Sequence, residues 1–255
     1  MQKKNILKKR FIELTGSFFS TYNTCQKQQD YALHYALKQE LDYLLLDGTE
    51  KFDLQDLIII PVHNFNTDEN IFKFHNQDKH IFYTTTPRKT KNLTQYPLFW
   101  TNSNPNFKKI RLFNKEISIA KYKRFLKYHR TNVLIYEDLY DKKNIEQQII
   151  KCLIQGNSYL VNYIHGTPYN FYAVITDNET NSATFGDSII LENKELFLYF
   201  NLPEISDVHL YHNNKHLQKK HDKQGMFKIS YTGSYHLIIN RYTLNWIYTN
   251  PIYVT

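Results

Sequence analysis

The chain has 255 residues, of which 42% are hydrophobic and 16% are aromatic, so it can bury one large core or two smaller ones. Its 32 Lys and Arg residues outnumber its 24 Asp and Glu residues and give a formal net charge of +8. No apolar run approaches the roughly 20 residues of a membrane-spanning helix, and the basic residues 1–10 lead into no long apolar segment. This composition excludes a disordered chain and transmembrane helices, and it predicts a soluble, cytoplasmic protein.

The basic charge and the cysteine content bear on partners and compartment. A net positive charge predicts an anionic partner, and an anionic small molecule, a phosphorylated glycan and nucleic acid all fit it. Lys, Asn, Ile and Tyr are frequent along the whole chain, however, which favours a compositional habit of the source genome over a binding patch as the origin of the charge. The two cysteines, Cys25 and Cys152, form neither a disulfide framework nor a zinc cluster and indicate a reducing compartment.

The first 156 residues alternate between helical and strand patterns. Residues 11–21 are apolar and β-prone, and four apolar residues between positions 33 and 41 follow at helical spacing. The apolar run at 57–62 shows no alternation, which is typical of a strand covered on both faces and favours a parallel or mixed sheet. Residues 144–153 predict an amphipathic helix that Gly156 is placed to stop. Further strands are predicted at 43–46, 80–85, 110–113 and 133–136, with a basic helix around 119–128 and a loop at 87–106.

Beyond Gly156 the pattern changes to short strands separated by polar turns, which is typical of an antiparallel β-sandwich. Asn213 and Asn214 fit the centre of a tight hairpin turn, because asparagine tolerates positive φ. In the last extended run, residues 246–253, Pro251 cannot donate to a central ladder, so this strand is expected at or near an edge. The other strands are predicted at 159–164, 171–176, 196–202, 208–211, 226–231 and 235–240.

Several segments of the second half occur in the order of a known domain. CLIQGNSY at 152–159, ATFGDSI at 183–189 and VHLYHNNKHL at 208–217 precede a fixed series of small, aromatic and Asn-Pro positions. Together they resemble the C-terminal β-domain that follows the catalytic part in one group of the PHP (polymerase and histidinol phosphatase) superfamily of metal-dependent hydrolases. The closing series consists of Gly233, Tyr235, Trp246, Asn250, Pro251, Ile252 and Tyr253.

The resemblance implies a metal site in the N-terminal part, where the family's imidazoles and carboxylates bind two or three divalent ions at strand ends. In the matching segments, Asp47, His80 and Asp138 keep a ligand type and predict a reduced site for one divalent ion, Mn²⁺, Zn²⁺ or Mg²⁺. Each of the three equally fits a structural role at a turn or strand end. A shift of this alignment by one or two residues would bring in His63, His75 or Glu137.

Other positions that carry metal ligands in the family have lost them here. The resemblance therefore implies weak metal binding and a degenerate, inactive relative. In the β-rich half, five histidines match no metal-binding motif, and solvated hairpin positions are the expected account of them. The lost ligand positions are Phe19, Thr21, Gly48, Asn64 and Tyr140, and the five histidines are His209, His212, His216, His221 and His236.

The predicted fold class is therefore α/β plus all-β. It has a basic tail at 1–10, a shortened and distorted PHP-like (β/α) barrel at 11–156, and an antiparallel β-sandwich at 157–255. The predicted function is that of a degenerate PHP-hydrolase-like protein that binds an anionic ligand or a protein partner. The alternative is a metal-dependent phosphoesterase with a reduced metal site, acting on a phosphorylated small molecule or glycan. We expect helices almost only before residue 160, and the three candidate ligands at one mouth of the barrel.

Overall fold

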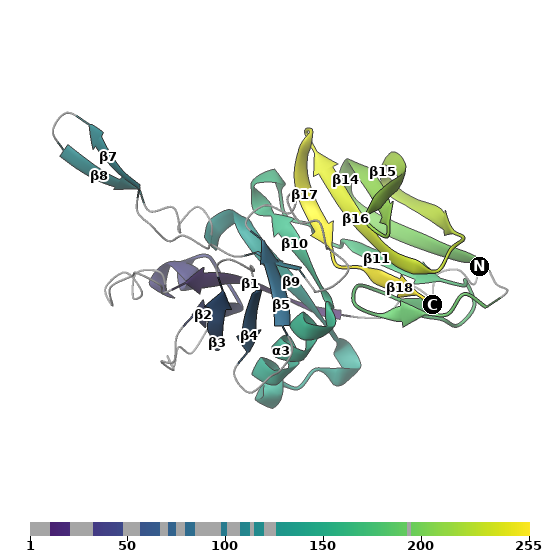
Figure 1. Ribbon diagram of the computed structural model, residues 1–255, viewed down its shortest axis with the longest axis horizontal. Coiled ribbons are helices and arrows are strands. Elements are labelled where there is room, and N and C mark those ends of the chain that lie inside the picture. The colour runs from purple at the N-terminus through teal and green to yellow at the C-terminus, as the bar shows by residue number, and fades with distance from the viewer. Residues whose placement is uncertain are drawn as a thin grey trace.

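The computed structural model describes residues 11–20, 33–47, 57–66, 71–74, 80–84, 98–100, 108–112, 115–119, 126–192 and 195–255. Strands dominate these residues, as expected from a chain with 21 Tyr and 17 Phe (Figure 1). The strands of the first half are β1 (Phe11–Ser20), β2 (Tyr43–Asp47), β3 (Ile58–Asn66), β4 (Ile71–Phe74), β5 (His80–Thr84), β6 (Leu98–Trp100), β7 (Lys108–Leu112), β8 (Lys115–Ile119) and β9 (His129–Tyr136).

The second half begins with the helix α3 (Ile145–Gln155), and strands follow it almost without interruption. They are β10 (Ser158–Asn162), β11 (Tyr172–Thr176), β12 (Ser182–Ala183), β13 (Ser188–Ile189), β14 (Leu196–His212), β15 (Lys215–Ile229), β16 (Gly233–Arg241), β17 (Leu244–Thr249) and β18 (Ile252–Val254). Shorter helical segments lie at 33–38 and 126–128 and at η2 (Glu137–Leu139), η3 (Lys142–Asn144) and η4 (Tyr163–His165).

Sixteen strands join in one mixed sheet, while β7 and β8 form a separate hairpin. The main path through the sheet runs β12-β11-β14-β16-β17-β10-β9-β1-β2-β3-β4-β5-β6. Strands β1, β2 and β3 are parallel to one another, which confirms the mixed sheet predicted from their apolar runs. Strand β9 lies antiparallel to β1, and β10 lies antiparallel to β9.

The predicted fold class is wrong. A (β/α) barrel requires parallel strands throughout, whereas β9 opposes β1, and β4 opposes both β3 and β5. A separate β-sandwich is also absent from the described residues, because β10 pairs with β9 on one side and β17 on the other and so continues the same sheet. Hydrophobic periodicity located most of these strands, but strand direction depends on pairing between distant segments, which periodicity does not report.

The largest hydrophobic core forms where the sheet bends back over itself. Strands β9, β10, β11, β14, β16, β17 and β18 all supply side chains to this one core. Along β14 the buried positions alternate with more accessible ones, as a strand covered on one face requires. Since strands from opposite parts of the sheet share a core, the β11–β12 end faces the strands β1 and β9 (Figure 1).

Helix α3 covers the other face of β9 and its neighbours. Ile149, Ile150 and Leu153 lie on its buried stripe and share a second core with side chains of β2, β3 and β9. The helix ends at Gly156, which has a φ of 85° and donates its N–H to the Cys152 carbonyl at 2.9 Å. The predicted helix and its glycine stop are therefore confirmed.

The end of α3 is locked to the segment that precedes β13. Gly186 has a φ of 81°, and a Cβ atom there would lie 2.4 Å from the Gln155 carbonyl oxygen. The next residue, Asp187, accepts hydrogen bonds from the hydroxyl of Tyr136 and from the side-chain amide of Asn157. These contacts hold the β12–β13 segment beside β9 and fix one wall of the cavity described below.

The last residues form two strands joined at a corner. Strand β17 lies between β16 and β10 and is therefore central, contrary to the predicted edge position. Pro251 follows it outside any ladder, and β18 then continues along β16 while pairing with β13 on its other side. Pro251 therefore ends one strand and redirects the chain. Because it lies between two strands, its missing N–H removes no ladder hydrogen bond, although both strands lie inside the sheet.

Two further predictions are confirmed by the described residues. Asn213 and Asn214 occupy the turn between β14 and β15 with φ values of 46° and 64°. Beyond residue 160 the only helical segment described is the three-residue η4. Of the predicted basic helix around 119–128, residues 126–128 are helical, but residue 119 ends strand β8. Of the predicted loop at 87–106 only 98–100 are described, and they form strand β6, contrary to the prediction. Within the described parts of the chain, no helix combines the length and apolar character needed to cross a bilayer.

Candidate ligand pocket

The three candidate metal ligands lie at different places in the sheet. Asp47 ends β2 and aligns with Ser20 at one end of β1, whereas Asp138 follows β9, whose Tyr136 aligns with Phe11 at the other end of β1. At about 3.3 Å per residue, the ten-residue β1 separates these two levels by about 30 Å. The expectation that Asp138 shares one mouth with Asp47 is therefore wrong.

His80 starts β5, which β3 and β4 separate from β2. Three strand spacings correspond to about 14 Å between the backbones of Asp47 and His80, and for both residues the structure describes the backbone alone. In the part of the chain whose side chains are described, no three His, Cys, Asp or Glu residues are grouped so that they could hold a metal ion. The predicted metal binding at Asp47 and His80 stays a prediction.

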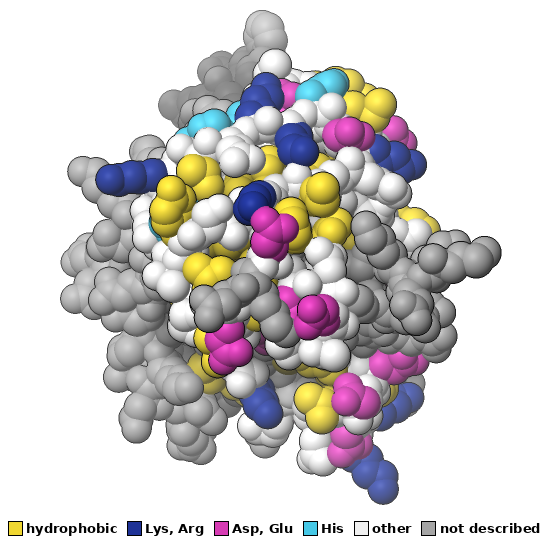
Figure 2. Space-filling model, turned by 90° about the vertical axis from the view of Figure 1, so that its right-hand side faces the viewer, with side chains coloured by type: hydrophobic (Ala, Val, Ile, Leu, Met, Phe, Trp, Pro, Cys, Tyr) yellow, Lys and Arg dark blue, Asp and Glu magenta, His cyan; other side chains and the backbone are white. Residues whose placement is uncertain are grey.

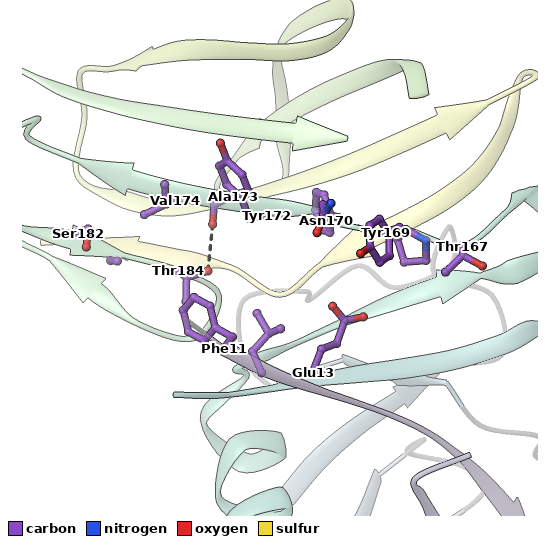
Figure 3. Close-up of a pocket in the computed structure, with 14 residues that line it drawn as sticks. Phe11, Glu13, Thr167, Tyr169, Asn170, Tyr172, Ala173, Val174, Ser182 and Thr184 are labelled. Carbon is purple, nitrogen blue, oxygen red and sulfur yellow. Dashed lines mark hydrogen bonds between the residues drawn. The ribbon is translucent and has the colours of Figure 1, made fainter. Parts of the chain in front are cut away.

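The structure instead presents a cavity of about 560 Å³ between the two ends of the bent sheet. Its floor is formed by Phe11 and Glu13 of β1 together with Leu134 of β9. Its roof is formed by strand β11, the segment before it, and the β12 strand, where the Thr184 hydroxyl donates to the Ala173 carbonyl at 3.0 Å (Figure 3). The residues from the roof are 167–174 and 182–184.

Glu13 places a carboxylate at the floor of this cavity. Its position follows from strand alternation, since Phe11 and Glu13 face the cavity side of β1 while Leu14, on the opposite face of the strand, packs toward α3. Figure 3 shows the carboxylate directed into the space below Tyr169 and Asn170. The residue keeps contact with solvent through the cavity, although protein surrounds most of the carboxylate.

One oxygen of this carboxylate is fixed by two donors on neighbouring strands. The Tyr159 hydroxyl donates to Glu13 Oε1 at 2.8 Å, and the side-chain amide of Asn132 donates to the same atom. Both donors are completely buried. Among the described residues, Oε2 has no hydrogen-bond partner, so it is the atom available to a ligand.

Two further charged residues, Asp42 and Arg130, lie beside the hydrogen-bond network of Glu13. Asp42 Oδ2 accepts the backbone N–H of Thr15 at 2.7 Å, and the Arg130 guanidinium lies 4.6 Å from the ring centroid of Tyr163. Tyr163 in turn exchanges hydrogen bonds with the Asn132 side chain. The hydrogen bonds with Tyr163 hold the Asn132 side chain in place, and Asn132 in turn donates to Glu13.

The electrostatics of the site follow from its partial enclosure. Burial raises the pKa of the Glu13 carboxyl above its ordinary value, hydrogen bonds from Tyr159 and Asn132 oppose the rise, and the Asp42 charge adds to it. Burial also raises the pKa of Tyr159 well above its ordinary value, so this hydroxyl keeps its proton and acts as a donor. Burial lowers the pKa of Arg130, and the charge of Asp42 opposes that change.

The cavity lining has one sign of charge. Among the described residues that line it, Glu13 is the only one with a formal charge at neutral pH, and no Lys, Arg or His is present. Aromatic side chains contribute much of the remainder, and Tyr169 is 71% exposed. The lining also includes the apolar Phe11, Leu134 and Phe171. The arrangement therefore combines an apolar, aromatic surface with a single carboxylate, which is a frequent composition of small-molecule sites.

Sequence reasoning missed this site. Glu13 stands in an apolar strand pattern, FIELT, and its presence among apolar residues was the available signal. Its partners Asn132 and Tyr159 are 119 and 146 residues away in the chain, so only the fold brings them together.

Comparison of the chain with protein-family models, curated proteins and solved structures finds no match. The resemblance to PHP hydrolases consequently rests on the sequence motifs alone and stays a prediction.

Proposed function

We propose that this chain is a binding protein for a small organic cation, a ligand with an ammonium group on an apolar or aromatic body. The observation that carries the proposal is the Glu13 carboxylate, which is fixed through one oxygen and open to the cavity through the other. An ammonium group at Oε2 would form a charge-assisted hydrogen bond in a partly desolvated site.

The aromatic lining suits the rest of such a ligand. Aromatic rings attract cations through their π faces and also cover apolar groups, and Phe11, Tyr169 and Phe171 line the cavity. The cavity volume of about 560 Å³ falls within the range of about 300–1,000 Å³ that is typical of sites for small molecules. A ligand with one ring and a short amine-bearing chain therefore fits this space.

The earlier expectation of an anionic ligand has no support in this cavity. An anion would face the Glu13 carboxylate without a described cationic side chain in the lining to balance it. On the molecular face shown in Figure 2, the acidic and basic side chains of the described residues are interspersed.

Three probes with similar bodies test the proposal. 2-Phenylethylamine, 2-phenylethanol and 3-phenylpropionate differ mainly in whether the end group is cationic, neutral or anionic. Calorimetric titration of the full chain near neutral pH is expected to give the order amine, then alcohol, then carboxylate. Hydrogen bonds to charged groups contribute about 1.5–3 kcal/mol, so the amine is expected to bind about tenfold or more tightly than the alcohol.

The variant Glu13→Gln tests whether this selectivity comes from the proposed atom. A glutamine oxygen still accepts from Tyr159 and Asn132 but removes the charge, so the preference for the amine over the alcohol should disappear. The matched control is Glu204→Gln, which removes an exposed carboxylate outside the cavity lining and should leave binding unchanged. Tighter binding of the carboxylate probe, or equal selectivity in Glu13→Gln, would contradict the proposal.

A further inference from the structure

Two histidines come together on the hairpin formed by β14 and β15, away from the cavity. His209 Nδ1 and His216 Nε2 are 3.2 Å apart. The strands are antiparallel here, and a register shift after Leu210 leaves Leu217 as an extra residue. This bulge moves His216 opposite Tyr211 and within reach of His209, an approach that regular pairing of His209 with Lys219 would not predict.

Neighbouring rings hold the pair in place. The ring of His216 meets the edge of Tyr211 with centroids 5.3 Å apart, and Tyr211 stacks on His236 at 5.1 Å with an interplanar angle of 11°. His236 is buried, whereas His216 is exposed and His209 is half-buried. The four rings therefore form a row that is anchored in the protein at one end and open to solvent at the other.

We propose that His209 and His216 form an open two-histidine site for a late first-row divalent transition-metal ion, of which Cu²⁺ is the strongest binder. Two metal–nitrogen bonds of about 2.0–2.1 Å place their nitrogens about 2.8–3.0 Å apart at the 90° angle of tetragonal Cu²⁺ and about 3.3–3.4 Å apart at a tetrahedral angle. The observed separation of 3.2 Å lies between these values. A modest rotation of the two accessible rings would direct both lone pairs at one ion, and water would complete the coordination.

The charged side chains around His209 and His216 determine how tightly the pair would bind a metal ion. Lys219 lies opposite His209 and repels a cation, but its ammonium is paired with Asp207 at 3.0 Å. Asp207 also accepts from His221 at 2.8 Å, so its carboxylate is already engaged. Replacement of Lys219 by Gln would remove the nearest cation and release one carboxylate oxygen, so this variant should bind the metal more tightly.

In the experiment, the full chain is titrated with Cu²⁺ alone and, in a separate sample, with Mg²⁺, which binds nitrogen ligands poorly. Titration followed by calorimetry and by the visible absorption of copper should show one Cu²⁺ ion bound per chain, with an affinity that depends on both imidazoles. Mg²⁺ should not bind at this site. His209→Gln or His216→Gln converts a chelate into a single ligand and should weaken Cu²⁺ binding roughly 100-fold. His34→Gln, which removes an exposed histidine outside the hairpin, is the control and should leave it unchanged.

A second measurement does not depend on how the variants fold. In the wild-type protein, substoichiometric Cu²⁺ should broaden the imidazole NMR signals of His209 and His216 before those of the other histidines. Unchanged copper affinity in both glutamine variants, or broadening that begins at other histidines, would overturn the proposal.

Discussion

The side-chain amide of Asn250 donates hydrogen bonds to the carbonyl and hydroxyl oxygens of Ser158, at 3.0 and 2.9 Å. Both residues are completely buried, and 92 positions separate them in the chain. The contact joins the start of β10 to the corner between β17 and β18, immediately before Pro251. It therefore fastens the C-terminal corner to the strand that continues the sheet into the N-terminal half.

Removal of the Asn250 amide is expected to destabilise the fold. Asn250→Ala leaves buried oxygen atoms of Ser158 without this donor, and an unsatisfied buried polar group costs about 1–3 kcal/mol. Urea denaturation should show a free energy of unfolding lowered by about 2 kcal/mol or more. Asn201→Ala removes two hydrogen bonds near the surface and should cost clearly less; equal losses would show that the Asn250 contact has no special weight.

The close approach at Gly186 gives a second prediction. Gly186 and Gly166 both have positive φ, at 81° and 108°, but a Cβ at Gly186 would meet backbone atoms, whereas one at Gly166 would meet the flexible end of Arg241. Gly186→Ala should therefore destabilise the protein by several kcal/mol or prevent folding, while Gly166→Ala should cost about 1–3 kcal/mol through backbone strain. Thermal or urea unfolding of the two variants checks this; similar losses would contradict the close approach of the α3 end.

Local features of this fold could be predicted from the sequence, and its long-range features could not. The stripe of Ile149, Ile150 and Leu153 predicted α3, and the asparagine pair at 213 and 214 predicted the hairpin turn. Both depend on residues close together in the chain. The direction of β9 and the central position of β17 depend instead on which distant strands pair, and no local pattern carries that information.

His236 predicts a loss of stability in acid. Burial lowers its pKa from 6.5 to about 4, and neither ring nitrogen has a hydrogen-bond partner among the described residues. The unfolded chain therefore takes up this proton first, so the stability that neutral His236 contributes is full above about pH 6.5 and is lost as the pH falls towards about 4. The loss over this range should approach roughly 3 kcal/mol, measured by urea denaturation at several pH values.

The variant His236→Phe isolates this effect. Phenylalanine can keep the stacking on Tyr211 without a titrating group, so the decrease in stability between pH 6.5 and 4 should become smaller by roughly the same amount. His34→Gln, which alters an exposed histidine in a different part of the fold, should retain the wild-type pH dependence. An unchanged pH profile in His236→Phe would show that other groups control the response to acid.

The candidate site was harder to predict than the strands around it. The PHP resemblance predicted a site at Asp47, His80 and Asp138, but the antiparallel pairing of β9 with β1 places Asp138 at the opposite end of β1 from Asp47. In the sequence, Glu13 is one polar residue in an apolar strand pattern, and only the fold brings Tyr159 and Asn132 beside it. A binding site made by pairing of distant strands becomes visible only when the pairing is known.

The most direct test of the central claim is the pKa of Glu13 with and without 2-phenylethylamine, measured by NMR of the side-chain carboxyl carbon. In the free protein, burial should raise this pKa above its ordinary value. An ammonium group bound at Oε2 favours the charged carboxylate, so saturation with the amine should lower the pKa, while 2-phenylethanol should produce a smaller change. An amine that binds in the cavity but leaves the pKa of Glu13 unchanged would contradict the account.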